Sequence, residues 1–328
     1  MSKFLKYLAS FLFGLIVFIY FLKSLRAQEI QKAINFVLSF FGFCILLITI
    51  CTVLVAILRR QYILKNFGFK LSFLAILKSW FINFSLSYFT PISVTGGEIP
   101  SVLFLEKKHN VSFVDGFSTI IVDEILNSTL TFISILLGFL SFSFYGYFPE
   151  KLVFYFIAFI VFGLLFLLLF FYFKMLKKES IVKWFIDKFG LEKKIPISQN
   201  NNYIFEIEKN IIHFFDIKKI AFWKSFLLSL LREILLVFRS GVLIFFLTGG
   251  MEIQKILIIY ALVNLAYLFP VPASLGSLEL TSWWGFSILG FSNATSLSYC
   301  MTQRFIDILF AVFGSVIFLI FIFDIIKT

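Results

Sequence analysis

Charged residues are scarce in this chain: only 14% of its 328 residues are Asp, Glu, Lys or Arg. A soluble domain carries roughly 25%, because its outer surface must face water. Hydrophobic residues make up 60% of the sequence. A chain with so little charge can cover its surface only where lipid replaces water. The composition therefore excludes a soluble protein and predicts an integral membrane protein.

Cysteine and histidine are also nearly absent. Cys44, Cys51 and Cys300 all lie in apolar runs and form no CxxC pair, which argues against a disulfide framework and against a metal site. His109 and His213 lie in separate polar loops and are not part of a metal-ligand cluster. We therefore expect no metal, no cofactor and no catalytic residue, and we predict that the protein is not an enzyme.

The basic residues that are present give a net charge of +11. They lie mostly in the gaps between apolar runs, as the positive-inside rule predicts, so they do not indicate nucleic acid. Arg59, Arg60, Lys65 and Lys70 mark one cytoplasmic loop, and the lysine-rich segment 174–224 marks another. We expect a multi-pass protein of the cell membrane with both termini in the cytoplasm. Its expected partners are membrane lipids, of the anionic kind.

Apolar runs define the fold. A membrane helix needs about 20 residues at 1.5 Å rise each, and six runs are long enough: 4–22, 34–58, 112–146, 150–173, 221–248 and 293–326. Two further runs, 72–106 and 253–289, are interrupted by Pro and Gly at Thr90–Pro100 and Phe269–Glu279. The loop charges agree with one orientation only if both broken runs are re-entrant. The predicted fold is all-α, with about six full spans plus two re-entrant broken hairpins.

Residues 177–219 form the only sizeable stretch without a predicted span. Within it, apolar residues recur at helical spacing from Ile181 to Phe189 and again from Ile204 to Phe214. Each pattern predicts a short amphipathic helix that lies on the membrane surface.

An internal repeat joins the two broken runs. An offset of 181 residues aligns them without a gap and superimposes Asn83 on Asn264, Pro91 on Pro272, Ser93 on Ser274, Glu98 on Glu279 and Asp123 on Arg304. We divide the chain into membrane repeats 1–148 and 149–328, which the loop charges place in opposite orientations. Matching broken segments in an inverted-topology repeat indicate a transporter binding site. A duplication kept for packing is the alternative.

Ionisable residues inside the predicted spans are the candidates for that site. Each costs at least ~2.5–3.5 kcal/mol near the bilayer centre unless it is paired or wetted. They are Asp123, Glu124, Arg232, Glu233, Arg239, Arg304 and Asp307. Arg232 and Arg239, two helical turns apart, share one helix face and could hold a phosphate group. Ion pairs that merely lock the fold are the alternative.

The helices that restart after each break are the second candidate feature. Pro100 suits a first helical turn, and Ser277 is a candidate N-cap. Such helix N-termini favour anions. Glu98 and Glu279 would cap these helices, exchange a proton or meet a cationic headgroup.

At these residues the chain resembles the transmembrane region of the lysylphosphatidylglycerol synthase family, which is also described as flippase-like. The resemblance covers nearly the whole length and rests on Pro91, Gly96, Gly97 and Glu98, then on Pro270, Pro272, Leu275, Gly276 and Glu279, and finally on Arg304. Where the family shows an acidic residue followed by Arg, this chain has Asp123 and Glu124. Relatives that make aminoacylated lipid carry a soluble transferase domain, for which we expect no room after Thr328. The resemblance therefore implies translocation and not synthesis.

We predict flippase-like translocation of an anionic phospholipid or lipid-linked headgroup. The candidate substrate-binding or gating residues are Asn83, Pro91, Gly96, Gly97, Glu98, Asp123, Glu124, Arg232, Arg239, Asn264, Pro272, Gly276, Glu279, Arg304 and Asp307. Two alternatives stay open: an accessory subunit of a lipid-linked glycosyltransferase, and a lipid-modifying membrane enzyme. A homo-oligomer, or a complex with a glycosyltransferase or lipid synthase, would fit these alternatives.

Overall fold

The computed structural model describes residues 31, 34–89, 96–145, 151–189, 203–216, 218–269 and 271–327. Every regular element in these ranges is helical, which confirms the all-α prediction. The first predicted span, residues 4–22, and the motif residues Pro91, Ser93 and Pro270 lie outside the described residues.

Among the described residues, four helices are long and apolar enough to cross a membrane: α3 (Phe40–Asn66), α6 (Phe113–Tyr145), α7 (Lys151–Leu176) and α13 (Asn293–Lys327). They match four of the predicted spans. A fifth candidate is the pair α10 (Ile220–Thr248) and α11 (Ile253–Ala266), which are bent by 114° at Gly249–Glu252. The structure thus confirms a polytopic membrane fold, and the total of about six spans stays a prediction.

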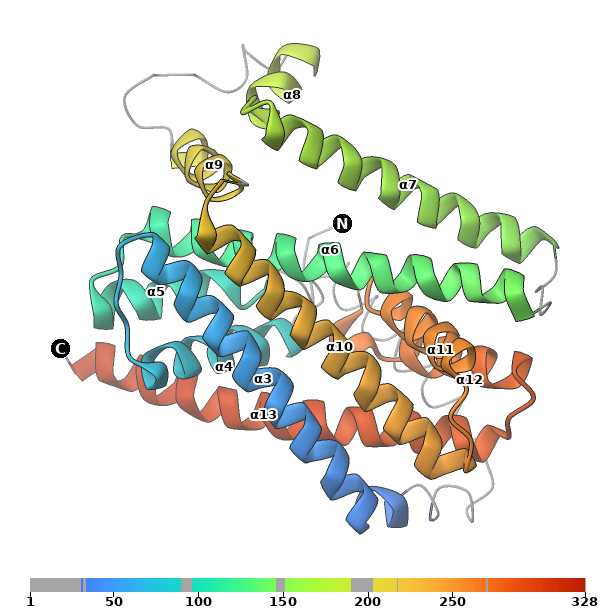
Figure 1. Ribbon diagram of the computed structural model, residues 1–328. Helices are drawn as coiled ribbons and strands as arrows, with labels where there is room; N and C mark the ends of the chain where they lie inside the picture. The colour runs from blue at the N-terminus through green and yellow to red at the C-terminus, as the bar shows by residue number, and fades with distance from the viewer. Residues whose placement is uncertain are drawn as a thin grey trace, which may run out of the picture.

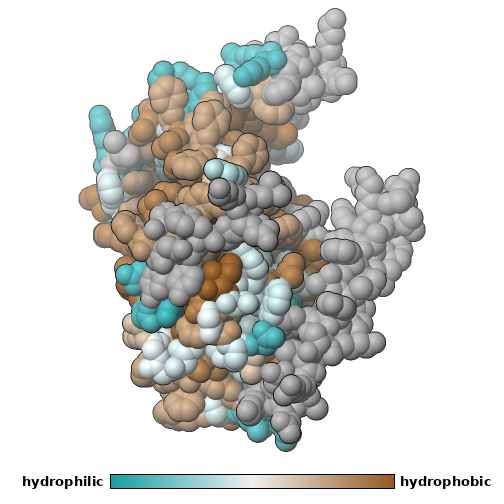
Figure 2. Space-filling model, turned by 90° about the vertical axis from the view of Figure 1, so that its right-hand side faces the viewer, coloured by the Kyte–Doolittle hydropathy of each residue, from teal (hydrophilic) through white to brown (hydrophobic). Residues whose placement is uncertain are grey.

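Exposed hydrophobic side chains mark the lipid-facing surface. Little of α7 is buried, and Phe156, Phe159 and Phe166 are 62%, 77% and 69% exposed. On the face drawn in Figure 2, hydrophobic residues cover much of the described surface. An apolar surface of this extent is stable only against lipid or another protein.

Both predicted breaks are present. The first broken run consists of α4 (Phe73–Phe89) and α5 (Glu98–His109), which pack against each other. The second consists of α11, the short turn η2 (Pro272–Ser274) and α12 (Ser277–Ile288), with α12 packed on α11. The structure confirms the interruptions, whereas the re-entrant path through the membrane stays a prediction.

The start of α12 differs from the prediction. Ser277 is the first residue of the helix and not its cap, and its hydroxyl donates to the carbonyl of Ser274 at 3.1 Å. The cap is Gly276, whose N–H donates to Glu279 Oε2 at 2.9 Å. Gly276 has a φ of +79°, which L side chains rarely adopt, so serine is the poorer residue at this corner. Pro100 lies in the first turn of α5, as predicted.

The 181-residue offset relates whole helices. It superimposes the starts of α3 and α10, α4 and α11, α5 and α12, and α6 and α13 to within two residues. Helices of one half pack on helices of the other: α4 packs on α13, α11 packs on α6, and α3 packs on α10. Each broken run therefore packs against the last span of the other half.

Equivalent helices run in opposite directions. Between α3 and α10, Arg59 meets Ser229 at 3.0 Å and Arg239 meets Thr49 at 3.3 Å, so the two helices are antiparallel. Lys108, just before α6, binds Asp324 near the end of α13 at 3.1 Å. Figure 1 shows α6 and α13 running in opposite senses across the molecule. An inverted-topology repeat requires this geometry, and the membrane side of each loop stays a prediction.

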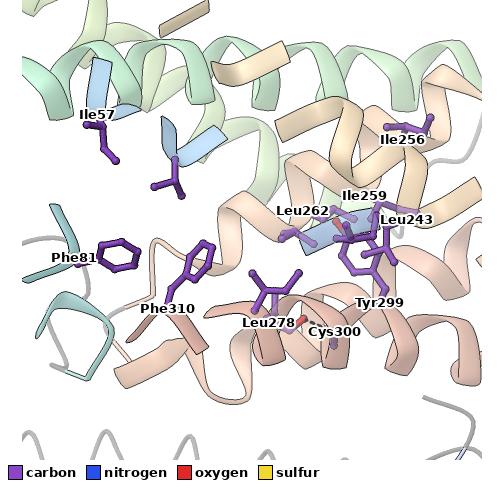
Figure 3. Close-up of a cluster of buried hydrophobic side chains, with 14 of the residues drawn as sticks. Ile57, Phe81, Leu243, Ile256, Ile259, Leu262, Leu278, Tyr299, Cys300 and Phe310 are labelled. Carbon is purple, nitrogen blue, oxygen red and sulfur yellow. Dashed lines mark hydrogen bonds between the residues drawn. The ribbon is translucent and has the colours of Figure 1, made fainter. Parts of the chain in front are cut away.

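A buried hydrophobic cluster joins the two halves. In it, Phe81 of α4 packs edge to face on Phe310 of α13, with ring centroids 5.8 Å apart. Leu262 of α11 and Leu278 of α12 belong to the same cluster (Figure 3). The core is thus shared, and the halves are not separate domains.

Two short helices lie in the predicted surface segment, α8 (Ile181–Phe189) and α9 (Tyr203–Phe214). Glu208 of α9 accepts the N–H groups of Ile181 and Val182 at 2.6 and 2.9 Å. This carboxylate satisfies the free donors at the start of α8 and favours its dipole.

Glycines allow the closest crossings between the halves. A Cβ at Gly138 in α6 would lie 2.5 Å from the carbonyl oxygen of Leu257 in α11. A Cβ at Gly314 in α13 would lie 2.2 Å from the carbonyl oxygen of Phe81 in α4. At both crossings the clash is with backbone, which cannot rotate away.

We expect Gly138→Ala and Gly314→Ala each to destabilise the protein by about 1–3 kcal/mol, as overpacking usually does. Gly163→Ala in α7 is the matched control, because nothing lies within 4 Å of its Cβ position and Ala favours a helix. Thermal unfolding of the detergent-purified variants measures the effect. Melting temperatures for Gly138→Ala and Gly314→Ala equal to the control would contradict the close crossings.

Candidate functional site

A cavity of about 220 Å³ lies between the two halves. Helices α3 and α4 line it from the first half, and α10, α13 and the turn η2 line it from the second. Its charged lining residues are Arg232, Arg239 and Asp307, and Tyr88 and Tyr267 add two hydroxyl-bearing rings. Three predicted site residues are thus brought together in one cavity.

The two arginines of α10 point into this region from one helix face, as their spacing predicted. Arg239 donates from Nη1 to Thr49 at 3.3 Å, while its buried Nε has no hydrogen-bond partner within the part of the chain that the structure describes. Arg232 donates to the side-chain oxygen of Asn127. A buried guanidinium N–H without a partner costs free energy, and this one belongs to a residue that lines the cavity.

Asp307 reaches the same cavity from α13. Its charged neighbours are Arg239 and Arg304, yet among the described residues its carboxylate forms neither a hydrogen bond nor an ion pair. The cavity therefore presents one acidic and two basic groups, a pattern that suits a polar headgroup.

The second break is held by an ion pair. Glu279 on α12 is fully buried and binds Arg304 of α13 through both carboxylate oxygens, one of them at 2.7 Å. Arg304 also donates to the carbonyl oxygens of Ala273 and Ser274, at 2.9 and 3.1 Å. The same guanidinium thus ties α12, α13 and the turn between α11 and α12 together.

The first half uses different partners. Asp123 of α6, which aligns with Arg304, accepts from Arg59 at 2.6 Å and from Arg60 at 3.2 Å. These two arginines, predicted to mark a cytoplasmic loop, are in fact buried inside α3. The prediction was wrong because it took adjacent basic residues at the end of an apolar run as its polar boundary. The apolar residues Ile63 and Leu64, which follow and are also buried, were the signal that the helix continues.

Glu98 lacks the support that Glu279 has. It is 8% exposed at the start of α5, and no donor in the described part of the chain bonds its carboxylate. Its charged neighbours are Arg60 and Glu124. Arg60 is itself buried, with Nε and Nη1 unpaired among the described residues. Two aligned glutamates therefore have unlike surroundings.

The remaining predicted residues shape the backbone. A Cβ at Gly97 would lie 2.0 Å from the carbonyl oxygen of Asn83, so glycine lets α5 start against α4. Gly96 lies in the turn just before it. Asn264 donates to the carbonyl of Tyr260 within α11 at 2.8 Å, and Pro272 opens the turn η2. None of these five residues lines the cavity.

The partners of Glu233 could not be predicted from the sequence. This buried carboxylate accepts from the Tyr260 hydroxyl at 2.9 Å and from Thr131 at 3.3 Å. Neutral donors on two other helices give no signal in the sequence, because they are separated from Glu233 by 27 and 102 residues.

Comparison with known proteins adds a family. A model described as the lysylphosphatidylglycerol synthase TM region matches residues 4–315. A UPF0104 membrane protein of Pyrococcus horikoshii is 33% identical over 90 residues. That stretch covers 27% of this chain and 27% of the relative. No solved structure matches the chain.

We expect Glu279→Gln to destabilise the protein by about 3–5 kcal/mol, because it leaves the buried Arg304 without its counter-charge. Glu98→Gln is the control at the aligned position and should change stability little, since no described hydrogen bond is lost. Unfolding in detergent compares the two variants. Equal losses would contradict the difference between the glutamates.

Proposed function

The chain belongs to the lysylphosphatidylglycerol synthase TM region family, and on this premise we propose that it translocates an anionic phospholipid or lipid-linked headgroup across the bilayer. The role is non-enzymatic, and the headgroup passes through the cavity between the halves while the acyl tails stay in lipid. The observation that carries the proposal is the unsatisfied Nε of Arg239 beside that cavity.

Phosphate chemistry supports this use of Arg239. A guanidinium binds two phosphate oxygens in a fixed fork and is more weakly hydrated than an ammonium group, which suits a low-dielectric site. Arg232 lies along the same wall and supplies a second positive charge. Arg304, which was expected to hold phosphate as well, is assigned here to the second break, because its guanidinium is engaged by Glu279 and two carbonyls.

The arrangement of the halves supports transport. The cavity lies where the first half meets the second, and equivalent helices of the two halves run in opposite directions. Rocking of one repeat against the other is how inverted-repeat transporters expose a fixed site to each side in turn. We propose the same alternation here.

A transport assay tests the role of Arg239. In liposomes that contain the purified protein and fluorescent phosphatidylglycerol, we expect Arg239→Gln to slow translocation about tenfold or more, since a hydrogen bond to a charged group contributes about 1.5–3 kcal/mol. Arg239→Lys should be intermediate. Lys183→Gln, at an exposed position of α8, is the control.

Other outcomes would point elsewhere. Normal transport by Arg239→Gln would remove the cavity from the path. A new lipid product in the extracts would favour a membrane enzyme, and the absence of both transport and product would favour an accessory subunit.

We further propose that Glu98 binds and releases the proton that drives transport. Glu98 lies near a second carboxylate, Glu124 on α6, and near one base, Arg60 on α3. Two neighbouring carboxylates readily share one proton. The single charged residue of α4, Lys78, is exposed and lines a different cavity. Glu279 cannot take this role while it is paired with Arg304.

We expect Glu98→Gln to remove the dependence of the transport rate on an imposed pH gradient while leaving thermal stability close to that of the wild type. Transport in liposomes with and without the gradient measures this. Glu98→Asp, which keeps a titratable group, should retain part of the response. A full response in Glu98→Gln would exclude Glu98 as the coupling group.

A further inference from the structure

A larger cavity, of about 390 Å³, lies apart from the central one and shares no lining residue with it. It is formed by the start of α4, the end of α5 and the last turns of α13, and we call it the α4–α5–α13 groove. Several of its lining side chains, among them Leu74, Lys78 and Lys108, are exposed, so the groove opens to the surface. The proposed transport path does not use it.

One rim of the groove is basic. Lys78, Lys108 and His109 line it together with a single acid, Asp324. Within the described part of the chain Lys78 has no ion-pair or hydrogen-bond partner. Lys108 binds Asp324 at 3.1 Å, but both side chains are well exposed, at 38% and 52%. Such surface pairs contribute little and exchange readily for another anion.

The rest of the lining is apolar. Phe104 and Phe321 form a buried floor with their rings 5.2 Å apart, edge to face. Leu74 and Ile320 are exposed beside it, at 63% and 58%. A cationic rim above an apolar floor that continues into a lipid-facing surface is complementary to the phosphate and upper acyl chain of a phospholipid.

Comparison of the halves shows that the fold does not need these basic residues. The 181-residue offset places Ile259, Leu289 and Gly290 where the first half has Lys78, Lys108 and His109. The helices of both halves form the same pairs with apolar residues at these positions. The positive-inside rule accounts for lysines anywhere on a cytoplasmic surface, whereas these basic residues converge on one groove and the adjacent Lys107 does not line it.

We propose that the α4–α5–α13 groove is a binding site for an anionic glycerophospholipid of the adjoining leaflet. Lys78 and Lys108 bind the phosphate, Asp324 releases Lys108 as the lipid enters, and one acyl chain lies along Leu74 and Ile320. Binding here does not depend on translocation through the central cavity.

Native mass spectrometry of the full chain in detergent, titrated with phosphatidylglycerol or phosphatidylcholine, tests the site. We expect the double variant Lys78→Gln, Lys108→Gln to weaken retention of one phosphatidylglycerol molecule about tenfold or more, since each basic residue near an anionic surface contributes about fivefold. Retention of phosphatidylcholine should not change. Asp324→Asn should strengthen phosphatidylglycerol binding, because it removes the competing carboxylate.

Lys107→Gln is the matched control, with the same change of charge one residue away and outside the groove. An equal loss in Lys107→Gln would mean diffuse attraction to a basic surface and would overturn the proposal. So would full retention by the double variant. Complete displacement of the lipid by inorganic phosphate would assign the site to free phosphate instead. Arg239→Gln should leave this retention unchanged, so failure of the transport proposal and failure of this one give different results.

Discussion

The cost of placing a charge in a low-dielectric interior governs this structure. An ionised side chain near the bilayer centre must be paired, hydrated or neutralised. The second half meets this demand with the Glu279–Arg304 pair, which also satisfies two carbonyls of the turn before α12. The first half meets it with Asp123 between two arginines of α3. The positions of α12, α13 and the central cavity follow from these pairs.

The two halves place their helices at corresponding positions but differ in charge. At one aligned position the first half has an acid, Asp123, and the second has a base, Arg304. In the second half, Arg304 pairs with Glu279 on α12, the helix after the break. In the first half, the aligned Asp123 pairs instead with two arginines of α3. Glu98 is the residue that this difference leaves without a counter-charge of its own. The two aligned breaks therefore differ: the second is held by the Glu279–Arg304 ion pair, whereas the carboxylate of Glu98 has no hydrogen-bond donor among the described residues.

Apolar runs and their interruptions predicted the helices and both breaks, because membrane helices depend on local sequence: length, hydrophobicity, Pro and Gly. Pairing between charges was not predictable in the same way. Arg59 and Asp123 are 64 residues apart, and only the packing of α3 on α6 brings them together. The N-cap of α12 was predicted at the wrong residue, Ser277. The positive φ at Gly276 outweighs the capping preference of serine. The residues that line the central cavity come together only because helices of one half pack on helices of the other. No single segment of the sequence encodes that packing.

That packing between the halves has a consequence for biosynthesis. Helix α4 packs on α13, whose contact residue Phe310 emerges from the ribosome more than two hundred residues after Phe81. Until then, α4 is in the membrane without the helix it packs against. Contacts of such long sequence separation form late and slowly. Assembly in the membrane must therefore be largely post-insertional, and the nascent first half is the species that a membrane insertase or quality-control protease would encounter.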